Sequence, residues 1–385
     1  MANENKFVSD LNLINLPIFT TSKKIKKTSE IEEIVLPEKN GINIKLVIRY
    51  SSEEKLTSFD RKVIANIEYL FCQKYDIQNI ETAFNTEYSR QFDLFLKERK
   101  IKKEDLSEAV KQKIIINAIN IVKQEFKLFL TLGMINEVIY DKTYAHSQIK
   151  KSLEKLGSTF IHQQSDYFVD GSKLEISSIP LIEYMYTETK NNYRNSVIIS
   201  LNSFHIVNLI KKKFVVTDIK LLNSFKSPIS GRLSELLRKS LYGSKSFKKD
   251  KVTYTYDYLC AYLQLEQRTS KSLIIQQLTQ PLNELIEKKI IVNWIITKEL
   301  FGFEISFYHS LNFYEIQYKA LDTKTMIKVQ KGLLDLSENE NDEYVRLENE
   351  VLSFINSTNL PKDLNIDAFK TYYMTYLFLR KMECD

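Results

Sequence analysis

The spacing of hydrophobic and polar positions along the chain predicts where its helices and strands lie. Residues 42–48 alternate between apolar and polar with a period of two, which indicates a half-buried strand. Thr57 and Asp60 form a capping-box-like start, and apolar residues follow them at helical spacing. Residues 93–132 carry a continuous apolar helical face, so they predict a long helical insertion.

A short basic helix is expected within residues 143–161. Its inward-facing positions are Ile149, Leu153 and Leu156. Two extended runs follow, 173–186 and 196–201, separated by a polar turn at 190–195. Helices followed by a hairpin are the order of a winged helix, in which the hairpin flanks the DNA-recognition helix.

The same order of elements is repeated in the second half of the chain. Helices are expected to begin at Pro228, Tyr256 and Ser270, since proline is tolerated in a first helical turn. Two strands, 290–297 and 303–308, follow them. Gly302 suits a tight turn between these strands, so a second winged helix is predicted.

Beyond Tyr308 the pattern predicts a helical tail with an acidic middle, closed by a docked helix around Phe369 and Tyr373. The predicted fold class is helix-rich α+β, with two tandem winged-helix domains and a helical C-terminal extension. The expected domains are an arm without its own core at 1–40, a first winged helix at 41–210 with the insertion 93–132, a second at 211–310, and the extension at 311–385.

Composition places the chain among soluble globular proteins. Its 385 residues exceed one average domain, and 43% are hydrophobic and 27% charged. The first residues lack a signal-peptide pattern, and no apolar run reaches the ~18 residues that span a bilayer, so a cytoplasmic, bacterial protein is expected. Cys72, Cys260 and Cys384 are odd in number and widely spaced, which favours reduced thiols over disulfides or a metal site.

Basic residues are concentrated in one stretch. Residues 211–251 hold twelve Lys or Arg against Asp218, Glu235 and Asp250, a net charge of +9, whereas the whole chain carries +6. Such a concentration suits a surface that binds a polyanion, because each phosphate it neutralises releases a counterion. A solvated basic face without a ligand is the alternative interpretation.

Several segments together resemble theta-type plasmid replication initiators of the replication initiator protein A kind. Lys226-Ser227-Pro228 followed by Arg232-Leu233-Ser234-Glu235-Leu236-Leu237 is similar to the start of that family's second winged helix. Leu278–Leu285, with Pro281 inside a helical pattern, is similar to its recognition helix. Leu56–Asp60 and Tyr144–Ile161 resemble parts of its first unit. The resemblance covers about residues 42–310.

The resemblance implies that each unit lays its third helix in the major groove and its hairpin along the backbone of duplex DNA. Gln276, Gln277 and Gln280 are then the candidate base readers, since an amide can pair twice with adenine. The candidate phosphate contacts of the second unit are Arg268, Lys271, Lys288 and Lys298. Its further DNA-binding candidates are Lys226, Arg232, Lys245, Lys248, Lys249 and Ser270. The candidates of the first unit are His146, Gln148, Lys150 and Lys151. A merely exposed polar face is the alternative for each.

Enzyme motifs are absent from the sequence. His146, His162, His205 and His309 are solitary, whereas a rolling-circle nickase needs a histidine pair to hold a metal. No Gly-x4-Gly-Lys, Cys-x2-Cys or His-Glu-x2-His pattern occurs, so neither catalysis nor a cofactor is expected.

The expected function is an origin-binding initiator that opens nearby DNA and recruits host replication machinery such as the helicase. The resemblance also implies a homodimer formed through the first unit. A winged-helix transcription regulator and a protein-interaction scaffold are the alternatives.

Overall fold

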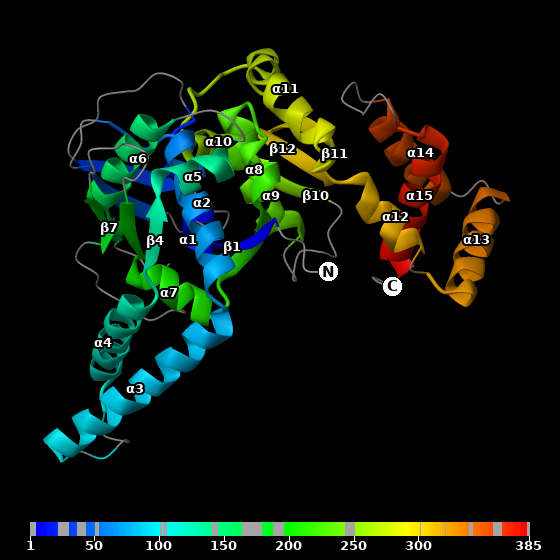
Figure 1. The fold of residues 1–385 in the computed structure, drawn as a ribbon. Coiled ribbons are helices and arrows are strands. Elements are labelled where there is room, and N and C mark those ends of the chain that lie inside the picture. Colours follow the sequence, from blue (N-terminus) through cyan, green and yellow to red (C-terminus); the bar gives the residue numbers. More distant parts are fainter. Residues whose placement is uncertain are drawn as a thin grey trace. The chain divides into compact units, whose positions relative to one another are not determined.

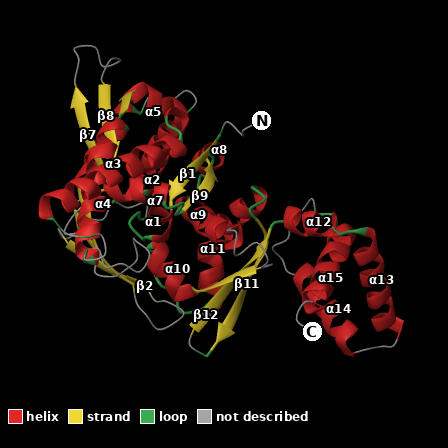
Figure 2. Ribbon diagram, turned by 90° about the horizontal axis from the view of Figure 1, so that it is seen from below, coloured by secondary structure: helices red, strands yellow, loops and turns green. Residues whose placement is uncertain are grey.

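The computed structural model is helix-rich α+β and contains small antiparallel sheets (Figures 1 and 2). It describes residues 5–21, 31–36, 44–50, 54–100, 102, 106–140, 145–163, 179–187, 196–242, 251–300, 302–319, 321–338, 342–356 and 364–382. The chain divides into unit 1, Met1–Leu236 with Tyr258–Glu266, and unit 2, Leu237–Asp257 with Gln267–Asp385. No helix in the described ranges is both long enough and apolar enough to cross a membrane.

The elements follow the chain from β1 to α15. Those of unit 1 are β1 (Lys6–Asp10), α1 (Leu11–Asn15), β2 (Ile31–Leu36), β3 (Ile44–Tyr50), α2 (Ser58–Lys74), α3 (Ile77–Arg99), α4 (Glu108–Glu125), β4 (Leu128–Thr131), α5 (Leu132–Ile139), α6 (His146–Ser158), β5 (Thr159–Gln163), β6 (Ile179–Pro180), β7 (Ile182–Thr187), β8 (Ser196–Leu201), α7 (Ser203–Ile210), β9 (Phe214–Asp218) and α8 (Ile219–Asn223). Two helices, α9 (Pro228–Tyr242) and α10 (Tyr256–Leu263), each contain a boundary between the units. Those of unit 2 are β10 (Lys251–Thr255), α11 (Lys271–Glu287), β11 (Ile291–Glu299), β12 (Gly302–His309), α12 (Leu311–Lys319), α13 (Thr323–Glu338), α14 (Asp342–Ile355) and α15 (Ile366–Met382).

One arrangement of elements occurs twice along the chain. Motif 1 consists of β4, α5, α6, β7 and β8, and its sheet has the order β4-β8-β7. Between α6 and β7 the chain also forms β5 and β6, which belong to the β2-β3-β5-β6 sheet. Motif 2 runs β10, α10, α11, β11, β12, and its sheet has the order β10-β12-β11. In both motifs two helices follow the first strand, and the third strand lies between the first and the second. All of these pairings are antiparallel.

Several elements begin where local sequence signals predict that they should. The capping box at Thr57 starts α2, where the Asp60 carboxylate accepts a hydrogen bond from the backbone N–H of Thr57 at 2.7 Å. The strand at 196–201 and the helix starts at Pro228 and Tyr256 are also confirmed. Proline inside α11 does not end that helix, because Pro281 is buried and the helix continues to Glu287.

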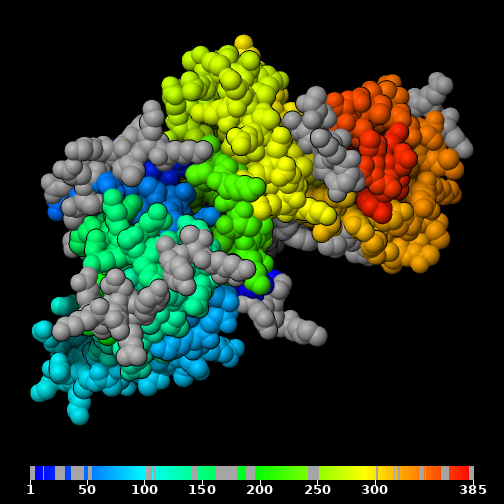
Figure 3. Space-filling view, turned by 45° about the horizontal axis from the view of Figure 1, so that its top comes forward, coloured from blue at the N-terminus to red at the C-terminus, as the bar shows by residue number. Residues whose placement is uncertain are grey.

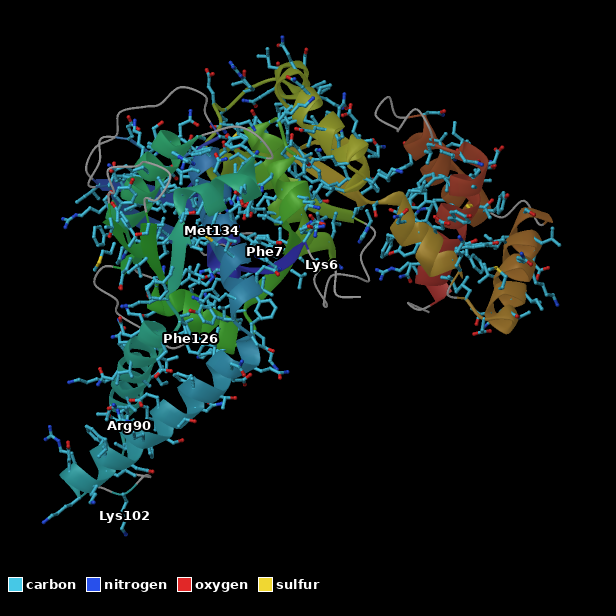
Figure 4. The ribbon with its side chains drawn as sticks, in the orientation of Figure 1. Lys6, Phe7, Arg90, Lys102, Phe126 and Met134 are labelled. Carbon is cyan, nitrogen blue, oxygen red and sulfur yellow. The ribbon has the colours of Figure 1, made fainter. Side chains whose placement is uncertain are left out.

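The predicted insertion at 93–132 has different bounds and is not one helix. It is a helical hairpin of α3 and α4, which begins at Ile77 and extends away from the β4-β8-β7 sheet (Figure 1). Helix α3 ends where Lys100 adopts the left-handed conformation at φ 52°. Residues 128–131 leave the helical pattern and form β4, with Leu128 and Leu130 buried. Figure 4 labels Arg90 on α3 and Lys102 beyond its C-terminal end.

The N-terminal segment is part of the core of unit 1. Strand β1 pairs with β9, and Leu13, Leu16 and Phe19 are fully or almost fully buried. Two hydrogen bonds add to this attachment. The Thr21 hydroxyl donates to the backbone carbonyl of Leu263, and the side-chain amide of Gln264 donates to the backbone carbonyl of Pro17. The segment was expected to lack a core of its own; its apolar side chains fill the core built by other elements.

The C-terminal helices of unit 2 pack around an aromatic cluster. Tyr314 on α12 contacts Phe369 and Tyr373 on α15 edge to face, with ring centroids 5.6 and 5.2 Å apart. The predicted docked helix at Phe369 and Tyr373 is confirmed, since both side chains are buried. Phe354 on α14 also contacts Tyr308 of β12 at 4.7 Å, so this bundle shares its core with the motif 2 sheet.

Candidate nucleic-acid interface

Helix α11 of unit 2 has one buried and one exposed face. Its first turn is capped by Ser270, whose side chain accepts a hydrogen bond from the Leu273 N–H at 3.4 Å. Four apolar side chains are buried along one side: Ile274, Leu278, Leu282 and Leu285. On the opposite side Gln276, Gln280 and Asn283 are exposed. Their spacing of four and three residues places these amides in one row on the helix surface.

Tyr256 fixes the start of α11 relative to the segment that precedes it. Its hydroxyl donates to Oε1 of Gln277 at 2.6 Å and accepts from the backbone N–H of Arg268 at 3.1 Å. Gln267 also donates to the carboxylate of Asp257 at 2.7 Å. These bonds join residues 267–268 and α11 to the beginning of α10. Because its Oε1 is engaged, Gln277 is better suited to holding this segment than to reading a base.

The predicted DNA-contacting residues of motif 2 differ in how exposed their side chains are. Lys271 and Lys298 are exposed, whereas Arg268 and Lys288 are half-buried. Ser270 is exposed and serves as the helix cap. In Figure 3 the yellow-green and yellow part of the chain, which contains α11, lies at the surface.

Helix α6 of motif 1 presents a smaller polar face. Ile149, Leu153 and Leu156 are buried, as predicted. Gln148 is exposed, and His146 and Lys150 are half-buried. The ammonium of Lys150 lies 4.9 Å from the ring centroid of Tyr186 on β7, a cation–π contact within the motif.

Two other lysines of α6 are engaged with carboxylates. Lys151 is 56% exposed and forms an ion pair with Glu54 at 2.7 Å. Lys155 is buried and pairs with Asp60 of α2 at 2.5 Å. Helix α6 of motif 1 therefore exposes fewer polar side chains than α11 of motif 2 does.

Arg232 does not lie at a surface, so the structure corrects its expected role as a DNA contact. Its side chain is 1% exposed and pairs with Glu235 at 2.8 Å. Its guanidinium donates to the backbone carbonyls of the N-terminal segment at Leu13 and Leu16. A side chain held in this way stabilises the core of unit 1 and cannot reach a phosphate.

The remaining basic candidates divide between surface and undescribed segments. Lys226 is exposed in unit 1. Lys245, Lys248 and Lys249 lie outside the described residues. Asn283 and Tyr256 of this candidate interface were not among the positions predicted from the sequence. Asn283 could have been found from its spacing of seven residues after Gln276 and three after Gln280, whereas no local signal marks the two hydrogen bonds of the Tyr256 hydroxyl.

No protein-family model matches the chain, and no curated protein matches its sequence. The chain is similar in structure to domains 2 and 3 of RctB, a crystal structure determined on selenomethionine derivatives. The TM-score is 0.44 at 11% sequence identity, over 78% of this chain and 99% of that one.

Proposed function

We propose that the chain is a sequence-specific DNA-binding protein that initiates replication at repeated duplex sites, without enzymatic activity of its own. The observation that carries the proposal is the exposed row of Gln276, Gln280 and Asn283 on α11. An α-helix fits the major groove, and side-chain amides can form two hydrogen bonds with adenine there. Lys271 on the first turn of α11 supplies charge for phosphates.

The repeated order of elements supports a protein with two DNA-binding units. A strand, two helices and a hairpin, with the third strand in the middle of the sheet, is the arrangement we interpret as a winged helix. Two such motifs can engage successive turns of one site. A winged-helix transcription regulator is the alternative, since it usually needs one DNA-binding unit beside an effector or dimerisation domain. DNA flanking the gene that lacks direct repeats beside an AT-rich tract would favour the regulator.

The finer parts of the proposal rest on the resemblance of residues 226–237 and 278–285 to plasmid replication initiators. They are binding of direct repeats at an origin, opening of an adjacent AT-rich tract and recruitment of the host helicase in a bacterial cytoplasm. A homodimer formed through motif 1 belongs to the same set. A protein acting in this way needs neither a bound nucleotide nor a metal.

The affinity for DNA should fall steeply as salt rises. We expect the logarithm of the binding constant to decrease linearly with the logarithm of salt concentration, by about 0.9 per phosphate contacted. Fluorescence anisotropy with a labelled duplex from the DNA flanking the gene measures this slope. Lys271→Gln should reduce the slope by about 1, whereas Lys331→Gln, an exposed lysine on α13, should leave it unchanged. An affinity indifferent to salt would contradict the proposal.

Substitution of Gln280 by alanine should relax base preference. The loss expected is about 1–3 kcal/mol of discrimination at one base pair, because a bidentate amide contact with adenine is removed. Competition anisotropy with duplexes that differ at single positions measures this preference. Gln330→Ala is a matched control, since Gln330 is also an exposed glutamine on a helix, α13. Unchanged discrimination in Gln280→Ala would remove Gln280 from the interface.

A further inference from the structure

The hairpin of β11 and β12 projects beyond the core of unit 2 (Figure 2). Ile296 and Ile305 form the last cross-strand pair in which both side chains are buried. Past that pair, residues 297–300 on the β11 side are all exposed. At ~3.3 Å per residue, the three strand residues beyond Ile296 carry the tip about 10 Å away from the buried sheet.

A leucine, Leu300, lies at the tip of the hairpin, where leucine is unusual. Glu299 pairs with Gly302, so two residues connect the strands, Leu300 and Phe301, the second of which lies outside the described residues. Two-residue connections favour Asn, Asp or Gly, because most of their conformations require positive φ. Leu300 is nevertheless 95% exposed, the largest exposed fraction among the large apolar side chains that the structure describes. Turn formation does not call for leucine here, which suggests that its side chain is used for contact.

The charges near the tip do not form a phosphate clamp. Lys298 and Glu299 are both exposed and adjacent in sequence, so their charges cancel. Glu304, which pairs with Thr297 across the hairpin, is half-buried and adds no positive charge. With one lysine and two glutamates, the tip carries no net positive charge and gains little from tracking along a DNA backbone. An apolar tip gains most where it can leave water, and the gap between two stacked base pairs offers such a place.

We propose that Leu300 is a wedge that enters the minor groove and partly unstacks one base step while α11 occupies the adjacent major groove. This inference rests on the proposed function and gives the hairpin a task that phosphate contacts do not provide. Insertion of leucine or phenylalanine between base pairs kinks the duplex toward the major groove. Pyrimidine–purine steps, above all TA, unstack most easily. The hairpin would then couple site recognition by motif 2 to local distortion of the bound DNA.

The test uses the full-length protein and duplexes from the DNA flanking the gene. One 2-aminopurine replaces an adenine at each TA or CA step in turn, because its fluorescence rises when it loses a stacked neighbour. Anisotropy on the same duplexes measures binding separately. Leu300→Ala and Leu300→Lys are compared with Val345→Ala, which changes an apolar side chain of α14 that is 49% exposed. Far-UV circular dichroism checks that every variant is folded.

The wild-type protein and Val345→Ala should raise the fluorescence at one step several-fold. Leu300→Ala and Leu300→Lys should still bind the duplex but lose most of that rise. A rise that persists in both Leu300 variants would overturn the wedge, as would wild-type binding without any rise, which would instead leave the tip for a protein partner. Wild-type protein that fails to bind at all would overturn the proposed function, and the wedge with it.

Discussion

Replacing Arg61 by methionine should lower the free energy of unfolding of unit 1 by roughly 3–5 kcal/mol, the usual cost of leaving a buried charge uncompensated. Arg61 on α2 is 2% exposed. Its Nε donates to Glu235 at 2.9 Å, and its two terminal nitrogens donate to Glu68 at 3.2 Å and to the Ser9 hydroxyl at 2.7 Å. Methionine fills a similar volume but leaves both buried carboxylates without this partner.

Changing the pH cannot substitute for this experiment. Burial alone lowers the pKa of Arg61, but the negative charges and hydrogen bonds of Glu235 and Glu68 outweigh burial and raise the pKa above its ordinary value. A group whose pKa is raised on folding contributes stability that is fully present below its unfolded pKa. Because arginine stays protonated at every accessible pH even in the unfolded chain, the contribution to stability is constant over the whole pH range in which the protein can be handled.

The measurement can separate the two units, because the chain has a single tryptophan, Trp294, and it lies in unit 2. In urea, Arg61→Met should shift the circular-dichroism transition of unit 1 more than the transition followed by tryptophan fluorescence. The double variant Arg61→Met with Glu68→Gln should recover part of the loss, since one orphaned charge is removed with the arginine. Arg90→Met removes an exposed pair with Glu87 and should leave the midpoint unchanged. A shift below about 1 kcal/mol would show that the buried cluster is not held by Arg61.

The same cluster shows where sequence reasoning reached its limit. Arg232 lies in a helix whose start was predicted correctly, yet its charge suggested a surface position. Its partners include backbone carbonyls at Leu13 and Leu16, more than 200 positions away in the chain, and no local pattern reveals them. One local signal was present, since Glu235 follows three residues later and both lie among leucines. An Arg and a Glu at that spacing on an apolar helix indicate a buried pair as readily as a basic face.

Elements with strong local chemistry were predictable for physical reasons. Ser270 and Thr57 start helices because their side chains or capping partners satisfy free N–H groups. Gly302 joins two strands because its φ of +124° is accessible only to glycine without strain. Two members of the exposed amide row on α11, Gln276 and Gln280, were predicted from the sequence. Gln277 lies one residue after Gln276, and because each helical residue is rotated by 100° its side chain leaves the row and bonds to Tyr256.

The strand β1 of the N-terminal segment and the strand β4 were not predicted, for another reason. Both are short apolar runs whose neighbours in the core come from distant parts of the chain, so length and period could not decide their structure. Residues 128–131 follow two residues after α4 and continue its apolar pattern. Only the pairing of Leu128 with Ile199 and of Leu130 with Val197 makes them a strand.

Unit 2 should lose stability as the pH falls from about 6.5 to about 4, because of His309. This side chain is fully buried, with its ring stacked on Phe313 at 3.9 Å between centroids. Burial lowers its pKa to about 4, although the backbone carbonyl of Leu241 opposes that shift. Nδ1 accepts from the Ser310 N–H at 3.0 Å, so Nε2 carries the hydrogen that points to the Leu241 carbonyl at 3.2 Å. Protonation of Nδ1 would break the first of these bonds.

The direction of the change in stability with pH follows from the lower pKa of His309 in the folded state. Above about pH 6.5 neither state is protonated and stability is unaffected. Below it the unfolded chain binds a proton before the folded one does, so stability declines until about pH 4 and then levels off. The total loss is of the order of 3 kcal/mol, from 1.36 kcal/mol per unit of pKa. Urea unfolding followed by Trp294 fluorescence at several pH values measures it. His309→Gln keeps a donor for Leu241 and removes the titration, so its curve should flatten relative to the wild type; two parallel curves would contradict the assignment.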